Sequence, residues 1–163
     1  MRSRTTTVST ALGALLTAAV LWAGDAAAQR NFDDVEIETL RVRPNIYMLV
    51  GAGGNITVQV GDDGVLIVDT QYAELSEKIL AAIAKLSKRP IRYIVNTHHH
   101  ADHTGGNANL RLAGSTVSGG NMQGAIADAG VGAQIVSHEN VLFRLSGATG
   151  EDALPSDGWP TST

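Results

Sequence analysis

The sequence of 163 residues contains no cysteine, and only 4% of its residues are aromatic. The absence of cysteine excludes a disulfide framework, a cysteine nucleophile and a cysteine-ligated metal site within this chain. A metal ion bound by the chain must therefore be held by histidine, aspartate or glutamate. A chain without cysteine also suits an oxidising compartment.

Positive charge is scarce as well. The chain has 12 Lys and Arg residues against 16 Asp and Glu residues, a formal net charge of −4, and the basic residues form no cluster. Proteins that bind nucleic acid draw much of their affinity from basic side chains at the phosphates, so we expect no nucleic-acid partner. The length and the 44% apolar composition are those of about one ordinary globular domain.

The first 28 residues have the pattern of a signal peptide. Two arginines precede an apolar run from Val8 to Trp22, and the small residues Ala26 to Ala28 follow. A membrane anchor is the alternative, but two threonines interrupt the run, and it is shorter than the roughly 20 residues that a span requires. We therefore expect residues 1–28 to be cleaved on export, which leaves a periplasmic or secreted protein with no stable membrane anchor.

The rest of the chain alternates between strand and helix patterns. Leu75, Ile79 and Ile83 repeat at helical spacing, so the segment from Ala73 to Ser87 is predicted to be an amphipathic helix that stops before Pro90. Further helices are predicted over 107–112 and over 139–145, the latter capped by Ser137 or His138. Strands are predicted over 35–42, 46–50, 56–60, 65–68, 91–95 and 133–136, with a tight turn at 61–64.

Four of the five histidines lie within six residues, His98 to His103, directly after a predicted strand. Imidazole and carboxylate are favoured ligands of zinc and similar divalent metals. His98 and His100 are two residues apart, so on an extended loop their rings can face one metal, while Asp102 and His103 turn toward a second position. We interpret His99 as a spacer. The alternative interpretation is a solvated polar loop.

The segment from Thr97 to His103 resembles the T-H-x-H-x-D-H signature of the metallo-β-lactamase superfamily, and Gly105-Gly106-Asn107 continues in the same manner. The segment from Val65 to Asp69 looks like the strand that in this superfamily ends in an aspartate beside the metal site. That likeness implies that Asp69 steadies a metal ligand. A carboxylate at a helix N-terminus is the alternative for Asp69.

The resemblance implies an α/β fold, the four-layer αββα metallo-β-lactamase sandwich, with residues 29–163 forming its N-terminal portion. The family supplies further metal ligands from the second half of its domain. Downstream of the loop this chain has only His138, which matches a family segment that is not a ligand. We therefore expect the fold to be incomplete on its C-terminal side, and expect the chain, if truncated, to bind metal weakly and to oligomerise.

The resemblance also implies a function. His98 and His100 would bind one zinc ion, and Asp102 and His103 a second, although the same ligands also accept iron or manganese. The implied enzyme is an exported hydrolase in which a metal-activated water attacks an amide, lactone or (thio)ester carbonyl of a small molecule, a β-lactam included. Asp102 would orient that water or carry a proton.

Two alternatives to this hydrolase remain. One is an iron-dependent oxidoreductase of the sulfur dioxygenase kind on the same fold. The other is a truncated fragment that binds metal without turnover. Histidine at position 103, where other branches have arginine or cysteine, resembles the third subclass of metallo-β-lactamases, glyoxalase II enzymes and lactonases.

Overall fold

The computed structural model describes residues 31–116, 132–147 and 153–163. The predicted signal peptide, residues 1–28, lies outside these ranges. Within them, no helix combines the length and apolar character that a membrane span would need.

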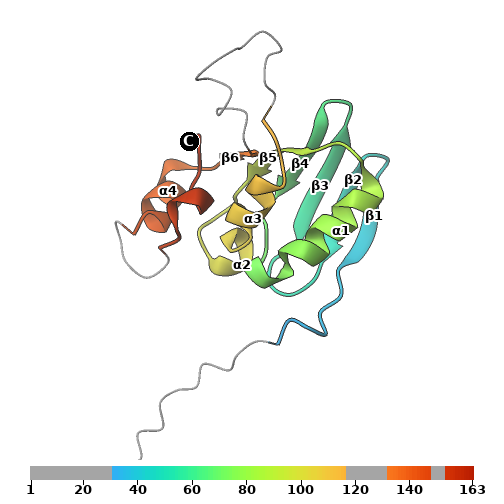
Figure 1. The fold of residues 1–163 in the computed structure, drawn as a ribbon, viewed down its shortest axis with the longest axis horizontal. Coiled ribbons are helices and arrows are strands. Elements are labelled where there is room, and N and C mark those ends of the chain that lie inside the picture. Colours follow the sequence, from blue (N-terminus) through green and yellow to red (C-terminus); the bar gives the residue numbers. More distant parts are fainter. Residues whose placement is uncertain (1–30, 117–131, 148–152) are drawn as a thin grey trace, which may run out of the picture. The chain divides into compact units, whose positions relative to one another are not determined.

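Six strands form one mixed sheet whose spatial order follows the sequence, from β1 to β6 (Figure 1). Neighbours among the first four strands are antiparallel, whereas β4, β5 and β6 run parallel. The predicted strands and the tight turn are confirmed, except that the first strand begins at Glu38 and not at Val35. The strands are β1 (Glu38–Arg43), β2 (Ile46–Val50), β3 (Ile56–Gly61), β4 (Gly64–Val68), β5 (Ile91–Val95) and β6 (Gln134–Val136).

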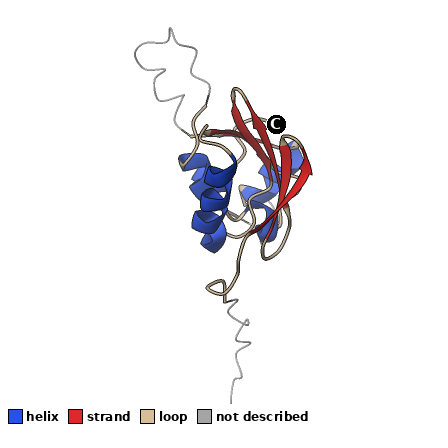
Figure 2. Ribbon diagram, turned by 90° about the vertical axis from the view of Figure 1, so that its right-hand side faces the viewer, coloured by secondary structure: helices blue, strands red, loops and turns tan. Residues whose placement is uncertain are grey.

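The predicted helices are also present. The amphipathic segment forms a short 3-10 helix, η1 (Ala73–Leu75), followed by α1 (Ser76–Leu86), and the last two predicted helices are α3 (Asn107–Leu112) and α4 (Glu139–Leu145). Two elements were not predicted, namely α2 (Ala101–Thr104) and the 3-10 helix η3 (Ser156–Gly158). Helices α1 and α3 lie side by side on one face of the sheet (Figures 1 and 2).

The core lies between this face and the helices. Strand pairing sets Val58 beside Ile67, Ile67 beside Ile94, and Ile94 beside Ile135, and all four side chains are fully buried. Helix α1 contributes Ile79 and Ile83 from its apolar stripe, as its periodicity predicts.

The opposite face of the sheet is more open in the described residues. Thr57, Gln59 and Tyr93 point to this side and are exposed, and Leu66 and Val95 beside them are half-buried. In the four-layer fold that the sequence predicts, a second sheet packs on such a face. The described residues form one sheet, which corresponds to one side of that sandwich.

The last described segment returns to the sheet beside β6. The backbone N–H groups of Thr161 and Ser162 donate to the carbonyl oxygen of Ile135 at 2.8 and 3.0 Å, and Ser137 N donates to Ser162 O at 3.2 Å. The Asn107 side-chain amide donates to Gly158 O at 2.9 Å, which ties α3 to the same segment.

The packing predicts a clear difference between two apolar truncations. Ile94→Ala removes a fully buried side chain from the middle of the core, so we expect the free energy of unfolding to fall by about 2–5 kcal/mol. Val42→Ala, at a side chain that is 56% exposed, is the control, with an expected change within about 0.5 kcal/mol. Urea unfolding measures both, and equal losses would contradict this description of the core.

Candidate metal centre

The site lies at the carboxyl ends of the parallel strands β4 and β5. Strand β4 leads directly into Asp69, and β5 leads into Asn96 and Thr97. A backbone hydrogen bond from Asp69 N to Val95 O, 2.8 Å long, continues the strand pairing one step beyond β4. Because parallel strands end at the same edge of a sheet, both loops emerge side by side.

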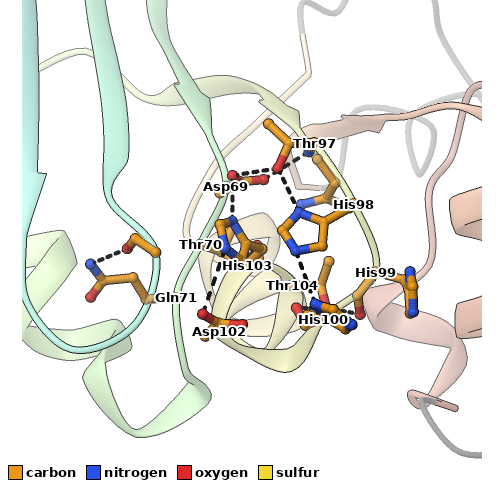
Figure 3. A network of polar contacts seen from close by, with 12 residues as sticks. Asp69, Thr70, Gln71, Thr97, His98, His99, His100, Asp102, His103 and Thr104 are labelled. Atoms are coloured by element: carbon orange, nitrogen blue, oxygen red, sulfur yellow. Dashed lines mark hydrogen bonds and ion pairs between the residues drawn. The ribbon is translucent and has the colours of Figure 1, made fainter.

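Asp69 is almost fully buried at the centre of the site (Figure 3). Its Oδ1 accepts from Thr97 N at 2.8 Å, and its Oδ2 accepts from the Thr97 hydroxyl at 2.7 Å. The same Oδ2 lies 2.8 Å from Nδ1 of His103. This contact favours a proton on Nδ1, which leaves Nε2 with a free lone pair for a metal. The helix that follows has Tyr72 at its N-cap position, so Asp69 does not serve as that helix's cap.

His98 and His100 form the first pair of candidate ligands. Nε2 of His98 lies 3.2 Å from Nδ1 of His100, and the rings converge in Figure 3. Two nitrogen ligands at about 2.0–2.1 Å from a tetrahedral zinc ion lie roughly 3.3–3.4 Å apart. The spacing therefore suits one shared metal. The Thr97 hydroxyl, 3.1 Å from Nδ1 of His98, steadies the other side of that ring.

Asp102 and His103 form the second pair. Oδ2 of Asp102 lies 3.6 Å from Nε2 of His103, too far for a hydrogen bond but suitable for two atoms that share a cation. Both residues belong to α2, which turns them away from the extended stretch that carries the first pair. The rings of His98 and His103 are 4.0 Å apart between centroids, so the two pairs are immediate neighbours.

The surroundings of His98 keep its ring in the form that binds metal. Partial burial, and then the neighbouring rings of His103 and His100, lower the pKa of His98, while Asp69 and Asp102 oppose this shift. A lowered pKa favours the neutral imidazole at neutral pH, and a metal ligand must be neutral.

The other two histidines take different places. Figure 3 shows the His99 ring on the far side of the loop from Asp102 and His103, where it packs against His100 with ring centroids 4.6 Å apart. His138 caps α4, because its Nδ1 accepts from the backbone N–H of Asn140 at 3.1 Å. The sequence offered Ser137 or His138 for that cap, and the structure selects His138.

The donor residues are of the types that bind zinc, but each pair has too few of them to complete a zinc site. Each pair offers two imidazole or carboxylate donors, and a buried carboxylate supports one of the rings. No group of three or more histidine, aspartate or glutamate side chains in the described part of the chain converges on a single point. A zinc ion held by either pair would therefore need further ligands, such as water or side chains beyond those described.

Sequence reasoning missed the polar residues behind the loop. Thr70 donates through its hydroxyl to His103 O at 3.1 Å and to Asn107 Oδ1 at 3.0 Å. Asn107 in turn exchanges hydrogen bonds with the Asn96 amide, and all three residues are buried. Asn107 continues the family signature, and that position was the one available signal for this network.

A glycine turn closes the site on the side of the second pair. Gly53 and Gly54 lie so near α2 that a Cβ on Gly53 would lie 2.6 Å from Cβ of Asp102, and a Cβ on Gly54 would meet the His103 ring. Gly54 N also donates to Asp102 O at 3.2 Å. The glycine-rich stretch at 51–54 is therefore packed directly against the second pair.

The backbone beside this turn adopts an uncommon conformation. Asp69 and Gln71 have φ of +66° and +52°, and among the described residues they are the only non-glycine residues with positive φ. Such conformations cost about 1–3 kcal/mol each and tend to gather at functional sites, where the surroundings enforce them.

The fold and these donor pairs agree with a family match. The sequence profile of the metallo-beta-lactamase superfamily matches residues 49–153, more than half of the chain. The chain therefore belongs to the metallo-beta-lactamase superfamily.

Several known proteins resemble the chain over part of their length. BJP-1, a subclass B3 metallo-beta-lactamase of Bradyrhizobium japonicum, is 29% identical with a TM-score of 0.51, over 69% of this chain and 37% of that one. A metallo-beta-lactamase of Cronobacter sakazakii is 25% identical with a TM-score of 0.52, over 77% of this chain and 43% of that one. A linear primary-alkylsulfatase of Pseudomonas sp. (strain ATCC 19151) is 47% identical over 45 residues, 27% of this chain and 8% of that protein. The chain thus spans less than half the length of each of these relatives.

The contact between Asp69 and His103 leads to a prediction for Asp69→Asn. An amide nitrogen in place of Oδ2 would face the Nδ1 proton of His103, so the ring should turn or change tautomer and lose its free Nε2. We expect metal affinity to fall by about 10- to 100-fold. Titration with Co²⁺ measures it, and Asp62→Asn in the exposed β3–β4 turn is the control. Unchanged affinity in a folded Asp69→Asn protein would contradict this role.

Proposed function

We propose that the chain provides the metal-binding part of an exported, zinc-dependent hydrolase. The observation that carries this proposal is the convergence of two donor pairs, with separations of 3.2 and 3.6 Å, at one strand edge. His98 and His100 would hold one metal, and Asp102 and His103 a neighbouring one. A bound metal would supply Lewis-acid activation of water and of the substrate's electrophilic centre.

The residues of the chain have distinct tasks in this function. Asp69 fixes the tautomer of His103, and Thr97 fixes the ring of His98. The Asp102 side chain is 32% exposed, so one of its oxygens can also orient a water molecule or hold a proton beside the substrate. The lowered pKa of His98 keeps that ligand unprotonated.

The relatives suggest the class of substrate. Two of the similar structures are metallo-beta-lactamases, which supports a β-lactam amide or a related lactone or (thio)ester carbonyl. The segment that is 47% identical to a linear primary-alkylsulfatase supports a sulfate ester as a second candidate. Both candidates are small molecules whose electrophilic centre carries an oxygen that a cation can polarise.

A non-catalytic metal-binding role is the second function with an observation in its favour. Each pair supplies two donors, and the described residues add no third. A chain with only these ligands would bind a metal without the enclosed, oriented site that turnover requires.

Metal content tests the binding part of the proposal. We expect the exported protein, with a mature N-terminus at Gln29, to contain one or more zinc ions per chain when it is purified without chelator. The double variant His98→Ala/His100→Ala should lose the metal of the first pair, because both of its donors are gone. Mass spectrometry gives both the N-terminus and the metal. Wild-type protein that takes up no zinc, even from a buffered excess, would contradict the site, and iron in its place would favour the dioxygenase alternative.

Hydrolysis tests the catalytic part. We expect the longest natural form of the protein to hydrolyse a chromogenic cephalosporin, a lactone, a thioester or an alkyl sulfate. This activity should be lost when a chelator removes the metal and should return when zinc is added. Asp102→Asn should lower kcat by about 100- to 10,000-fold if the carboxylate handles a proton, and Asp63→Asn in the exposed β3–β4 turn is the control. Zinc-loaded protein that hydrolyses none of these substrates would support the non-catalytic role.

A further inference from the structure

Gln71 is a buried amide that joins the loop after β4 to the glycine turn beside the second pair. It lies two residues beyond Asp69, is fully buried, and has a φ of +52°. Its Nε2 donates to the carbonyl oxygen of Gly54 at 2.6 Å, as the dashed line in Figure 3 shows. Its backbone carbonyl accepts from Gly106 N at 3.0 Å, so the residue also contacts the segment that follows α2.

The bond to Gly54 continues toward the candidate ligands. Gly54 accepts from Gln71 through its carbonyl and donates through its own N–H to Asp102 O at 3.2 Å. The glycine turn is therefore held between a buried side chain on one side and the backbone of α2 on the other. Gly53 and Gly54 lie so close to Asp102 and His103 that there is no room for a Cβ, so a small shift of the turn would move both side chains.

The oxygen of the same amide indicates that Gln71 does more than stabilise the fold. Oε1 of Gln71 is buried and has no hydrogen-bond partner. A buried acceptor without a partner lowers stability, and a methionine of similar length would fill the same space without that cost. The feature that methionine lacks is the N–H that holds Gly54.

We propose that Gln71 is a positioning residue for the second pair, setting the place of Asp102 and His103 through the Gly54 peptide while leaving His98 and His100 unaffected. The first pair is positioned by other contacts, since the Thr97 hydroxyl steadies His98 and Thr104 Oγ1 donates to His100 O at 3.1 Å. This inference rests on the proposed metal-binding function, and it predicts that the two pairs can be disturbed separately.

The test compares Gln71→Met with wild type in two measurements. Nitrogen-15 NMR of the metal-free protein reports the ring nitrogens of His98 and His103, and we expect a larger change at His103 than at the neighbouring His98 ring. Titration with Co²⁺ then follows the two binding steps, assigned with the double variants His98→Ala/His100→Ala and Asp102→Ala/His103→Ala. We expect the Asp102/His103 step to weaken at least tenfold and the other step to stay within about twofold.

Trp159→Phe is the matched control, because it removes a side-chain to backbone hydrogen bond of 2.7 Å, from Nε1 to Leu154 O, at a distant place in the sequence. It should leave both steps and both rings unchanged. If Gln71→Met does not fold, Gln71→Leu also removes the N–H that holds Gly54 and should weaken the same step selectively.

Two outcomes overturn the inference. Equal weakening of both steps would mean that Gln71 only stabilises the fold, and unchanged His103 signals with unchanged binding would mean that the turn does not position the pair. Wild-type protein that binds no Co²⁺ would contradict the proposed function instead, and the NMR comparison would still decide whether Gln71 positions His103.

Discussion

The buried carboxylate of Asp69 is the group on which the arrangement of the metal centre depends. It stands where β4 ends, it accepts two hydrogen bonds from Thr97 where β5 ends, and it contacts His103 in α2. One side chain thus connects the end of β4 to the end of β5 and to α2, 28 and 34 positions farther along the chain. The parallel pairing of β4 and β5 makes this geometry available, because it brings both strand ends to one edge before any side chain acts.

The two donor pairs are positioned by different contacts. The first pair lies on an extended stretch and is steadied by Thr97 at its start and by Thr104 at the end of α2. The second pair lies on a helical turn and is held from outside, by Asp69 on one side and the glycine turn on the other. The matched part makes up only 37% and 43% of two relatives in the superfamily, so those chains have room for additional groups around such a centre.

Much of this architecture follows from local sequence patterns. The β-branched runs, the Gly-Asp-Asp-Gly turn and the helical repeat of Leu75, Ile79 and Ile83 predicted the elements of the sheet and α1 closely, because each pattern acts within a few residues. The histidine motif likewise indicated the two donor pairs. The Gln71 bond to Gly54 and the Asn107 network could not be foreseen, since they join residues 17 and 37 positions apart whose types carry no periodic signal. Only the folded backbone brings such partners together.

The two borders of the sheet are protected in different ways, and this affects how the protein behaves at high concentration. The returning segment at Thr161 and Ser162 occupies the backbone groups of β6, so that border offers little to a strand from another molecule. The opposite border, β1, carries Glu38, Arg41 and Arg43, all exposed, and charged side chains on an outer strand discourage edge-to-edge growth. Fibril-like aggregation through strand addition is therefore disfavoured at both borders of the described sheet.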